Sequence, residues 1–432
     1  MDADRFATHS LHDPRVLRIL SAALNAVDPA DAVREYLPTL TGNVYGLGIG
    51  KASIPMLTAL AEAYPLSGAL AISKHASTAS SSLSATPNLF PVFLGSHPIP
   101  DSRSLEAGTR VLDFVSALSE EDTLVCLISG GGSALVTAPH EGITLEDMQA
   151  LTSLLLACGA RIDEINTLRR QLDRIKGGGL ARATKAKIIS LILSDVIGNP
   201  LEAIASGPTF PNPTTNADAI AILKKYNIKG QIPMSIVNFL ESNSLLFESE
   251  KQAARLQSRQ SQNIIIGDNK LAAQAALEQA QRDGFYSEIL TNELQGEARE
   301  VGVRLAKHLR DETSMRTRPF CLIAGGETTV TLRGLGKGGR NQELALAAVR
   351  ELSGLENVML IALATDGDDG PTDAAGAVAT GASAQRAESL GVDATDHLSR
   401  NDAYVCFDGL GDLIRTGPSG TNVNDLIFLL AL

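Results

Sequence analysis

Aromatic side chains are scarce in this sequence, and their scarcity narrows the ligands that it can bind. There is no Trp, and Phe, Trp and Tyr together make up only 4% of the residues. Sites that hold nucleobases by stacking depend on aromatic platforms, so a site of that kind is not expected. A small polar ligand fits the composition better.

Paired cysteines and long apolar runs are also lacking. No apolar run approaches the roughly 20 residues that a membrane-spanning helix needs. The N-terminus carries Asp2 and Asp4 and does not resemble a secretion signal. We therefore expect a cytoplasmic protein without membrane contact, whose cysteines are buried thiols rather than disulfides or zinc ligands. These cysteines are Cys126, Cys158, Cys321 and Cys406.

An excess of positive charge is the third absence. The formal net charge is -12 and the pI is about 5.1. An acidic surface repels phosphate backbones, which argues against nucleic-acid binding. A small anion can still bind, in a local pocket of Lys, Arg and backbone N–H groups. The sequence leaves a monomer and a homodimer open.

The chain has 432 residues, whereas a single core stops growing at roughly 250–300 residues. Two domains are therefore expected, and we place them at residues 1–245 and 246–432, with the last segment able to pack back on the first domain. Periodic apolar residues predict a helix over 11–36. Short apolar runs then alternate with helical stretches, which predicts an α/β fold with buried parallel strands. The predicted strands are 44–48, 124–129, 188–194, 263–266, 320–324, 328–332 and 358–364, and the predicted helices of the second half are 269–283, 295–311, 341–352 and 382–390.

Ligands of open α/β sheets bind beyond the carboxyl ends of the strands, so the loops after the predicted strands are candidate sites. The first is the segment 46–53. Its Gly48 and Gly50 allow the backbone to approach a phosphate, and Lys51 adds a positive charge where a helix begins. The spacing matches neither a Walker A loop nor GxGxxG. The alternative is a tight turn with a solvated lysine.

The second loop is Ser129-Gly130-Gly131-Gly132-Ser133. Three consecutive glycines are costly in conformational entropy, which favours a concave turn of N–H donors over a plain flexible turn.

A basic helix over 166–176 precedes three further glycines. One of its cations, Arg169, Arg170 or the terminal Lys176, could reach an anionic ligand, and a cation at the C-terminal end also balances the helix dipole.

Two carboxylates follow predicted strands. Asp195 at the end of strand 188–194 suits Mg²⁺ coordination or deprotonation of a hydroxyl, with a helix N-cap as the alternative. Asp366 lies in the acidic turn 365–370, which either binds a metal or holds a network of turns. The turn lacks EF-hand spacing.

Glycine-rich segments flank the predicted strand 328–332. Glu327 lies in the first segment, and Arg340 and Asn341 open the helix after the second. A planar guanidinium matches phosphoryl or carboxylate oxygens, and a surface ion pair is the alternative for Arg340. Glycine turns, two strong cations and strand-end carboxylates together predict a site for a polyanion with Mg²⁺, as in phosphoryl transfer.

Eight segments of the chain resemble the class II glycerate kinases, also called glycerate 2-kinases or the MOFRL family. They are 48–56, 127–135, 166–181, 194–198, 205–209, 325–342, 365–376 and 416–425. The resemblance covers nearly the whole chain, and the shared order of the segments makes it specific.

The resemblance implies a Rossmann-like N-terminal domain, a second α/β domain and an active site in the cleft between them. It implies D-glycerate and ATP as substrates, Mg²⁺ as cofactor and 2-phosphoglycerate as product, with Lys51 and Arg340 lining the active site. Asn199, Asn212 and Gln171 stand where the family often has Asp, Asp and His, so we assign them no role.

The predicted catalytic residues are then Lys51, Arg340 and Asp195, and the predicted Mg²⁺ ligands are Asp195 and Asp366. The residues predicted to bind ATP are Gly48, Gly50, Ser129, Gly130, Gly131, Gly132, Ser133, Lys176, Glu327 and Asn341. Three alternatives stay open: a kinase of another small hydroxy acid, a hydroxypyruvate reductase, and a non-catalytic sensor of a sugar acid. The reductase needs a nicotinamide site, yet the dinucleotide fingerprint is missing after strand 44–48.

Overall fold

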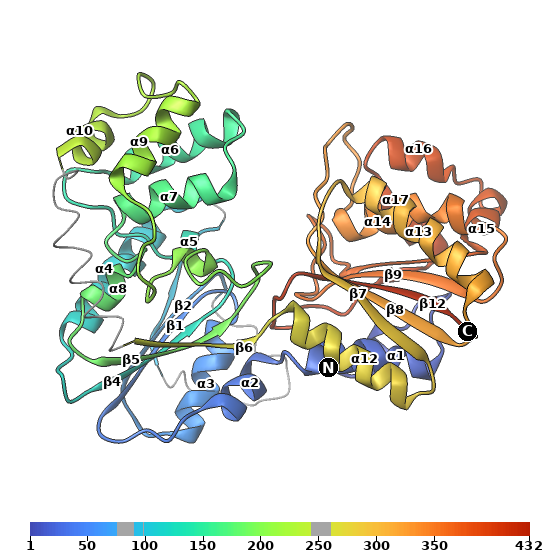
Figure 1. Cartoon of the computed structure of the whole chain (residues 1–432), viewed down its shortest axis with the longest axis horizontal. Coiled ribbons are helices and arrows are strands. Elements are labelled where there is room, and N and C mark those ends of the chain that lie inside the picture. The colour runs from blue at the N-terminus through green and yellow to red at the C-terminus, as the bar shows by residue number, and fades with distance from the viewer. Residues whose placement is uncertain (76–89, 98, 243–260) are drawn as a thin grey trace. The chain divides into compact units, whose positions relative to one another are not determined.

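The computed structural model describes residues 1–75, 90–97, 99–242 and 261–432, and these form two compact units. The central unit comprises Pro29–Ile266, and the terminal unit joins Met1–Asp28 to Gly267–Leu432. Both units are α/β, as predicted (Figure 1).

The central unit contains a six-stranded sheet in the order β3-β2-β1-β4-β5-β6. The pairs β1–β2, β2–β3, β1–β4 and β4–β5 are all parallel. Apolar runs in β1, β4 and β5 are buried almost throughout, which confirms the prediction of buried parallel strands. The strands are β1 (Val44–Ile49), β2 (Leu66–Ser73), β3 (Val92–Leu94), β4 (Thr123–Ile128), β5 (Lys187–Leu193) and β6 (Ser261–Gly267).

Helices cover both faces of this sheet (Figure 1). One face carries α2 (Pro29–Tyr36) and α3 (Ser53–Ala63), and the other carries α4 (Ser102–Ser116), α5 (Gly132–Leu135) and α8 (Gly179–Arg182). The remaining described helices share an apolar core of their own. They are α6 (Leu145–Ala157), α7 (Ile162–Leu172), α9 (Asn216–Lys225) and α10 (Met234–Ser242).

The terminal unit contains the second six-stranded sheet, in the order β11-β10-β9-β12-β8-β7. Strand β12 runs antiparallel to both β8 and β9, whereas β7 and β8 are parallel. The strands are β7 (Tyr286–Leu294), β8 (Phe320–Gly326), β9 (Val358–Ala364), β10 (Gly376–Thr380), β11 (Leu413–Ile414) and β12 (Asp425–Ala431).

Helices lie on both faces of the second sheet, in two groups (Figure 1). The first group is α1 (Pro14–Asn25), which packs against α12 (Asn269–Arg282). Buried side chains of α13, α14 and α17 form the core on the opposite face. This second group is α13 (Ala298–Met315), α14 (Arg340–Leu352), α15 (Ser383–Ser389), α16 (Ala394–Ser399) and α17 (Ala403–Leu410). Short 3₁₀ turns occur at Ala3–Phe6 in this unit and at Ile204–Ser206 in the central unit.

The N-terminal residues differ from the prediction. The helix expected over 11–36 is two helices, and α1 belongs to the terminal unit rather than to a domain 1–245. The apolar face of α1 packs on α12, a contact that periodicity alone does not reveal. The predicted boundary at 245/246 falls in 243–260, outside the described residues, and β6 beyond it completes the central sheet.

The strand predicted over 328–332 is also wrong. Only an isolated bridge between Glu297 and Thr329 occurs there. Most of the segment is exposed, and no described strand pairs with it. The four cysteines are free; Cys158 is half-buried and the others are buried. None of the helices in the described part of the chain is both long and apolar enough to cross a bilayer.

Candidate functional site

In the central unit, the turn after β1 is bonded to the turn after β4. Gly50 has φ +127°, and a Cβ there would lie 2.3 Å from Ser129 Oγ. The N–H of Lys51 donates to Gly130 O at 2.9 Å, and that of Ala52 to Ser129 Oγ at 2.9 Å. These N–H groups therefore join two protein turns instead of facing a ligand. Gly50 acts by allowing close approach, which favours a structural role over the predicted phosphate contact.

The turn after β4 keeps its donors available. Gly131 has φ +83°, and among the described residues no acceptor takes the backbone N–H of Gly130 or Gly131. A Cβ at Gly131 would lie 3.4 Å from both Lys51 Cγ and His97 Cδ2. The Lys51 side chain thus passes beside a concave glycine turn, an arrangement that suits an anion.

Serine side chains tie this turn to two further segments. Ser133 Oγ and Ser206 Oγ lie 2.7 Å apart, and Ser206 Oγ donates to Asn166 Oδ1 of α7 at 3.3 Å. Ala205 and Ser206 have φ +49° and +60°. Two consecutive non-glycine residues in the left-handed region store strain, which occurs mostly at functional sites.

Lys176 forms a buried ion pair in the structure. It is buried beyond the end of α7, and its Nζ donates to Asp173 Oδ2 at 2.5 Å and to Val136 O at 3.1 Å. Thr137 Oγ1 also donates to Asp173 Oδ2, at 2.7 Å. A buried ammonium bonded in this way favours a structural role over the predicted contact with a ligand.

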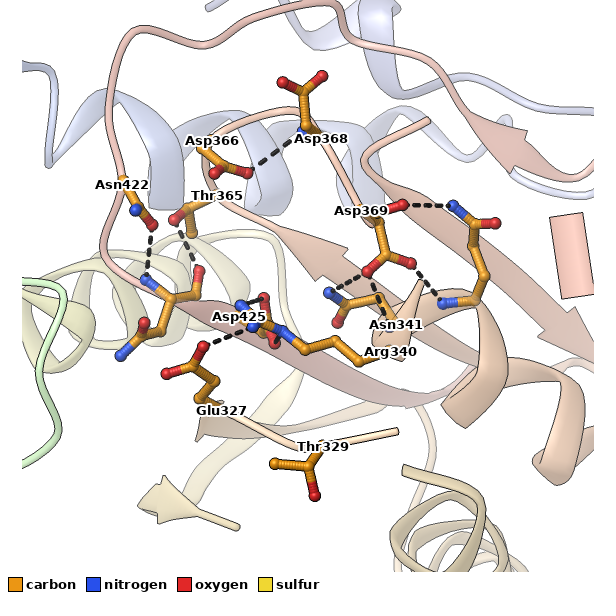
Figure 2. Close-up of polar contacts among 12 residues, drawn as sticks. Glu327, Thr329, Arg340, Asn341, Thr365, Asp366, Asp368, Asp369, Asn422 and Asp425 are labelled. Atoms are coloured by element: carbon orange, nitrogen blue, oxygen red, sulfur yellow. Dashed lines mark hydrogen bonds and ion pairs between the residues drawn. The ribbon is translucent and has the colours of Figure 1, made fainter. Parts of the chain in front are cut away.

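The sheet of the terminal unit brings distant segments to one edge. Asp425 at the start of β12 lies opposite Gly326 at the end of β8 and Ala364 at the end of β9. Because β12 is antiparallel to both neighbours, its first residue lies between their last residues. Glu327 follows β8 and Thr365 follows β9, so side chains from three strands meet there (Figure 2).

Arg340, at the start of α14, lies at the centre of this edge (Figure 2). Its Nε donates to Asp425 Oδ2 at 2.6 Å and its Nη2 to Asp425 Oδ1 at 3.1 Å, while Nη1 donates to Glu327 Oε1 at 2.5 Å. Burial opposes the charge of Arg340, but the charge and hydrogen bonds of Asp425 outweigh it and raise the pKa of Arg340. These contacts to described residues use three of the five guanidinium N–H donors, which leaves two for a ligand.

Asp369 fixes the start of α14. Its Oδ1 accepts from Asn341 N at 3.1 Å, and its Oδ2 accepts from Gln342 N at 2.8 Å. A Cβ on Gly339 would lie 2.3 Å from the Asp369 carboxyl, so glycine is required there. Burial raises the pKa of Asp369 to about 7 and that of Asp425 to about 6. The edge therefore holds two buried acids whose charge depends on pH near neutrality.

The predicted residues at this edge take different positions. Glu327 is paired with Arg340, and Asn341 is buried, with its Nδ2 donating to Asp369 Oδ1 at 3.3 Å. Asp366 is half-buried and accepts from Asp368 N at 3.2 Å. The geometry favours a structural role for Asn341.

A magnesium site can be compared with the carboxylates present. In the described ranges, no group of three or more His, Cys, Asp or Glu side chains is arranged to hold a metal. Mg²⁺ in phosphoryl-transfer enzymes keeps several waters and needs only one or two carboxylates besides the substrate phosphates. Asp195 and Asp366 are both half-buried carboxylates, the type of side chain that this requirement names.

Comparison with known proteins identifies the family. The model described as "Domain of unknown function (DUF4147)" matches residues 15–241, and that of the MOFRL family matches residues 320–425. The D-glycerate 2-kinase of Thermotoga maritima is 40% identical over 429 residues, covering 96% of this chain and 99% of that protein. The chain belongs to the glycerate 2-kinase family.

Further matches agree with membership of the glycerate 2-kinase family. The glycerate 2-kinase of Pyrococcus horikoshii is 38% identical, and the match covers 96% of each chain. A crystal structure of the Thermotoga maritima glycerate kinase matches with a TM-score of 0.84 at 38% identity, covering 96% of this chain and 98% of that one. A relative from Agrobacterium vitis, also 38% identical over 96% of this chain and 93% of that protein, carries the name putative hydroxypyruvate reductase.

Several residues of this glycerate 2-kinase family member give no clear signal in the sequence. Asp425 stands out only as part of a resembling segment, and Asp369 does not stand out from its acidic neighbours. The register of β12 brings Asp425 to the edge where Arg340 lies, and hydrogen bonds to the start of α14 hold Asp369 there. His97 next to Gly131 was also passed over, since it has no recognisable motif.

Proposed function

We propose that this protein transfers the terminal phosphoryl group of ATP to D-glycerate and yields 2-phosphoglycerate. Membership of the glycerate 2-kinase family across both units carries this proposal. The two clusters described above supply what the reaction needs, because phosphoryl transfer depends on positioning and charge neutralisation more than on covalent catalysis.

In this proposal the two remaining N–H donors of Arg340 bind the transferring phosphoryl group. The carboxylates of Asp425 and Glu327 fix the guanidinium plane before the substrate arrives, so little reorganisation is needed. Lys51, beside the glycine turn, neutralises phosphate or substrate oxygens. We propose that the N–H donors of Gly130 and Gly131 assist it.

The central sheet supports a Rossmann-like assignment for the first unit. Its strand order, 3-2-1-4-5-6, is the order of that fold, in which ligands bind where the strand order reverses. Strands β1 and β4 flank that point, and the turns that follow them carry Lys51 and Gly131. We therefore propose that a phosphate-bearing ligand binds at this point.

Asp195 and Asp366 are the proposed ligands of Mg²⁺. When bound, the ion would neutralise charge on the phosphate oxygens. Asp195 is also the proposed acceptor of the proton from the attacking hydroxyl. Its position two residues after the end of β5 suits either role.

Hydroxypyruvate reduction is the second candidate, because one relative carries that name. Hydride transfer would need a nicotinamide site, and the glycines after β1 lack the GxGxxG spacing. Oxidation of NADH by hydroxypyruvate in the presence of the pure protein would favour this function.

The decisive experiment is product analysis by ³¹P and ¹³C NMR after incubation with ATP, Mg²⁺ and D-glycerate. In the proton-coupled ³¹P spectrum we expect a doublet, because the phosphate on position 2 couples to a single proton. A triplet from the two protons at position 3 would overturn the regiochemistry, and the absence of any phosphorylated glycerate would overturn the kinase assignment.

A further inference from the structure

Helix α7 carries two adjacent arginines with contrasting surroundings. Arg170 is buried, and each of its three side-chain nitrogens donates to a protein oxygen: Nε to Asn212 Oδ1, Nη1 to Glu202 O and Nη2 to Thr167 Oγ1, each at 3.1 Å. Arg169 is half-buried and has neither a hydrogen bond nor an ion pair with any described residue. Arg170 thus stabilises the fold, whereas Arg169 keeps all its donors available.

The nearby carboxylate does not compensate Arg169. Asp173 lies one turn further along the chain, but its oxygens accept from Lys176 Nζ, Thr137 Oγ1 and backbone N–H groups. Asp173 and Lys176 balance one another, so Arg169 remains as an excess positive charge. Burial lowers the pKa of Arg169, and Asp173 only partly opposes that effect. A poorly solvated cation of this kind is costly unless an anion binds to it.

The position of Arg169 relates it to the glycine turn after β4. Asn166 lies three residues earlier and therefore on the same face of α7. Its Oδ1 accepts from Ser206, whose hydroxyl contacts Ser133 at 2.7 Å. This chain of contacts places the Arg169 face of the helix toward the turn Gly130–Ser133.

Two further basic side chains lie at the same turn. His97 and Lys51 both lie against Gly131. Although His97 is exposed overall, desolvation of its ring and the positive charges of Lys51, Lys74 and Arg169 lower its pKa to about 4. No carboxylate contributes to the His97 shift, so the turn is surrounded by positive charge contributed by β1–α3, β2 and α7.

We propose that Arg169 binds the carboxylate of the hydroxy-acid substrate and thereby selects an acid over a neutral polyol. The inference rests on the proposed kinase function. A guanidinium offers two parallel N–H donors that match a carboxylate, whereas the compact ammonium of Lys51 suits phosphoryl or hydroxyl oxygens. Selectivity for glycerate over glycerol then depends on one charge-assisted contact.

Steady-state kinetics of Arg169→Gln test the proposal, with Arg161→Gln as the control because Arg161 is an exposed arginine just before the same helix. We expect the KM for D-glycerate to rise about 10- to 100-fold, the size expected for a lost hydrogen bond to a charged group. The KM for ATP should change less than about 2-fold, and Arg161→Gln should match the wild type. Arg169→Lys keeps the charge without the paired donors, so its KM for D-glycerate should lie between those of the wild type and Arg169→Gln. A KM for D-glycerate within about 3-fold of wild type, or an equal rise in the KM for ATP, would overturn the proposal.

Direct binding separates this inference from the proposed reaction. In ¹⁵N NMR titrations of the unliganded protein, with the resonance assigned through His97→Gln, the pKa of His97 should rise in Arg169→Gln because a positive charge is lost. Saturating D-glycerate without nucleotide should raise it in the wild type. An unchanged His97 pKa in both cases would sink the assignment of Arg169 even if the wild type phosphorylates glycerate. A wild type that binds D-glycerate in this assay but forms no phosphorylated product would contradict the kinase function alone.

Discussion

Arg340 and Arg169 show how local charge balance distinguishes two arginines of one protein. Arg340 lies between the carboxylates of Asp425 and Glu327, and Arg169 has no such partner among the described residues. A compensated guanidinium is held in one orientation, which suits charge stabilisation during a reaction. An uncompensated one gains most from binding an anion in the ground state. Changes at Arg340 should therefore act on kcat, and changes at Arg169 on KM.

Replacement of Arg340 tests whether this residue acts on kcat. Arg340→Ala should lower kcat on the order of 10³-fold, by analogy with other arginines that stabilise a transferring phosphoryl group. It should also lower stability by about 3–5 kcal/mol, because Asp425 stays buried without its counter-charge. Turnover measurements and urea unfolding check the two effects. Arg350→Ala, an exposed change in the last turn of the same helix, is the control. Near-normal turnover by folded Arg340→Ala would remove this residue from the mechanism.

The buried acids predict how stability depends on pH. Burial raises the pKa of Asp369 from 3.8 to about 7, so the folded protein binds this proton more tightly than the unfolded chain. Its contribution to stability is therefore present below pH 4 and is lost as the pH rises toward 7. In Asp369→Asn, the free energy of unfolding should decline less steeply over this range.

Urea unfolding at several pH values measures how steeply the free energy of unfolding declines with pH. The control Glu120→Gln changes an exposed carboxylate and should keep the wild-type slope. If Asp369→Asn also kept it, the carboxyl of Asp369 would be ionised throughout.

At this scale the sequence predicts the residue types but not their partners. Arg340 and Glu327 can be predicted as candidates because glycines flank them and the helix start is readable. Asp369 and Asp425 cannot, since their positions at this edge follow from tertiary contacts and burial. The pairing of Lys176 with Asp173 gives no signal in the sequence beyond proximity in the chain.

Among the elements, the turn after β1 is the most constrained. Gly50 combines φ +127° with an approach to Ser129 that leaves no room for a Cβ. Gly50→Ala should lower stability by at least about 2 kcal/mol, from backbone strain and steric overlap together. Gly230→Ala is a matched control, because the added methyl meets nothing within 4 Å. Thermal unfolding of both variants is the measurement, and equal midpoints would contradict the close contact between the two turns.

Strands can be predicted from the sequence where a run of apolar residues is the dominant local pattern. Uniformly apolar runs identified β1, β4, β5, β8 and β9. Strand β7 was missed because its residues are only partly buried and do not form an apolar run. The segment 328–332 has strand-forming residues but no partner strand, so its local preference was overridden by the tertiary structure.

For the whole molecule, the assignment of α1 to the terminal unit is the main departure from the prediction. The apolar stripe of α1 can be predicted from the sequence, whereas the surface of α12 that it covers cannot. Beside the apolar contact, Arg18 pairs with Asp283 at 2.5 Å and Arg15 lies 5.0 Å from the centre of the Phe285 ring. Segments distant in sequence supply both partners.

A cavity in α1 tests this assignment. Leu20 is fully buried, so Leu20→Ala should cost about 2–5 kcal/mol. Hydrogen exchange should rise in α12, which packs against α1, and stay unchanged in β1 and β4. The exposed Leu156→Ala is the control. A loss of protection confined to the central sheet would instead support the predicted domain 1–245.

The division of the terminal unit has a consequence for biosynthesis. Its first 28 residues leave the ribosome before roughly 240 residues of the central unit, and only then does α12 follow. At about 5–20 residues per second, α1 waits roughly 12–50 s for the surface that it covers. During that interval its apolar stripe is open to chaperones, whereas the central unit can already complete its own sheet.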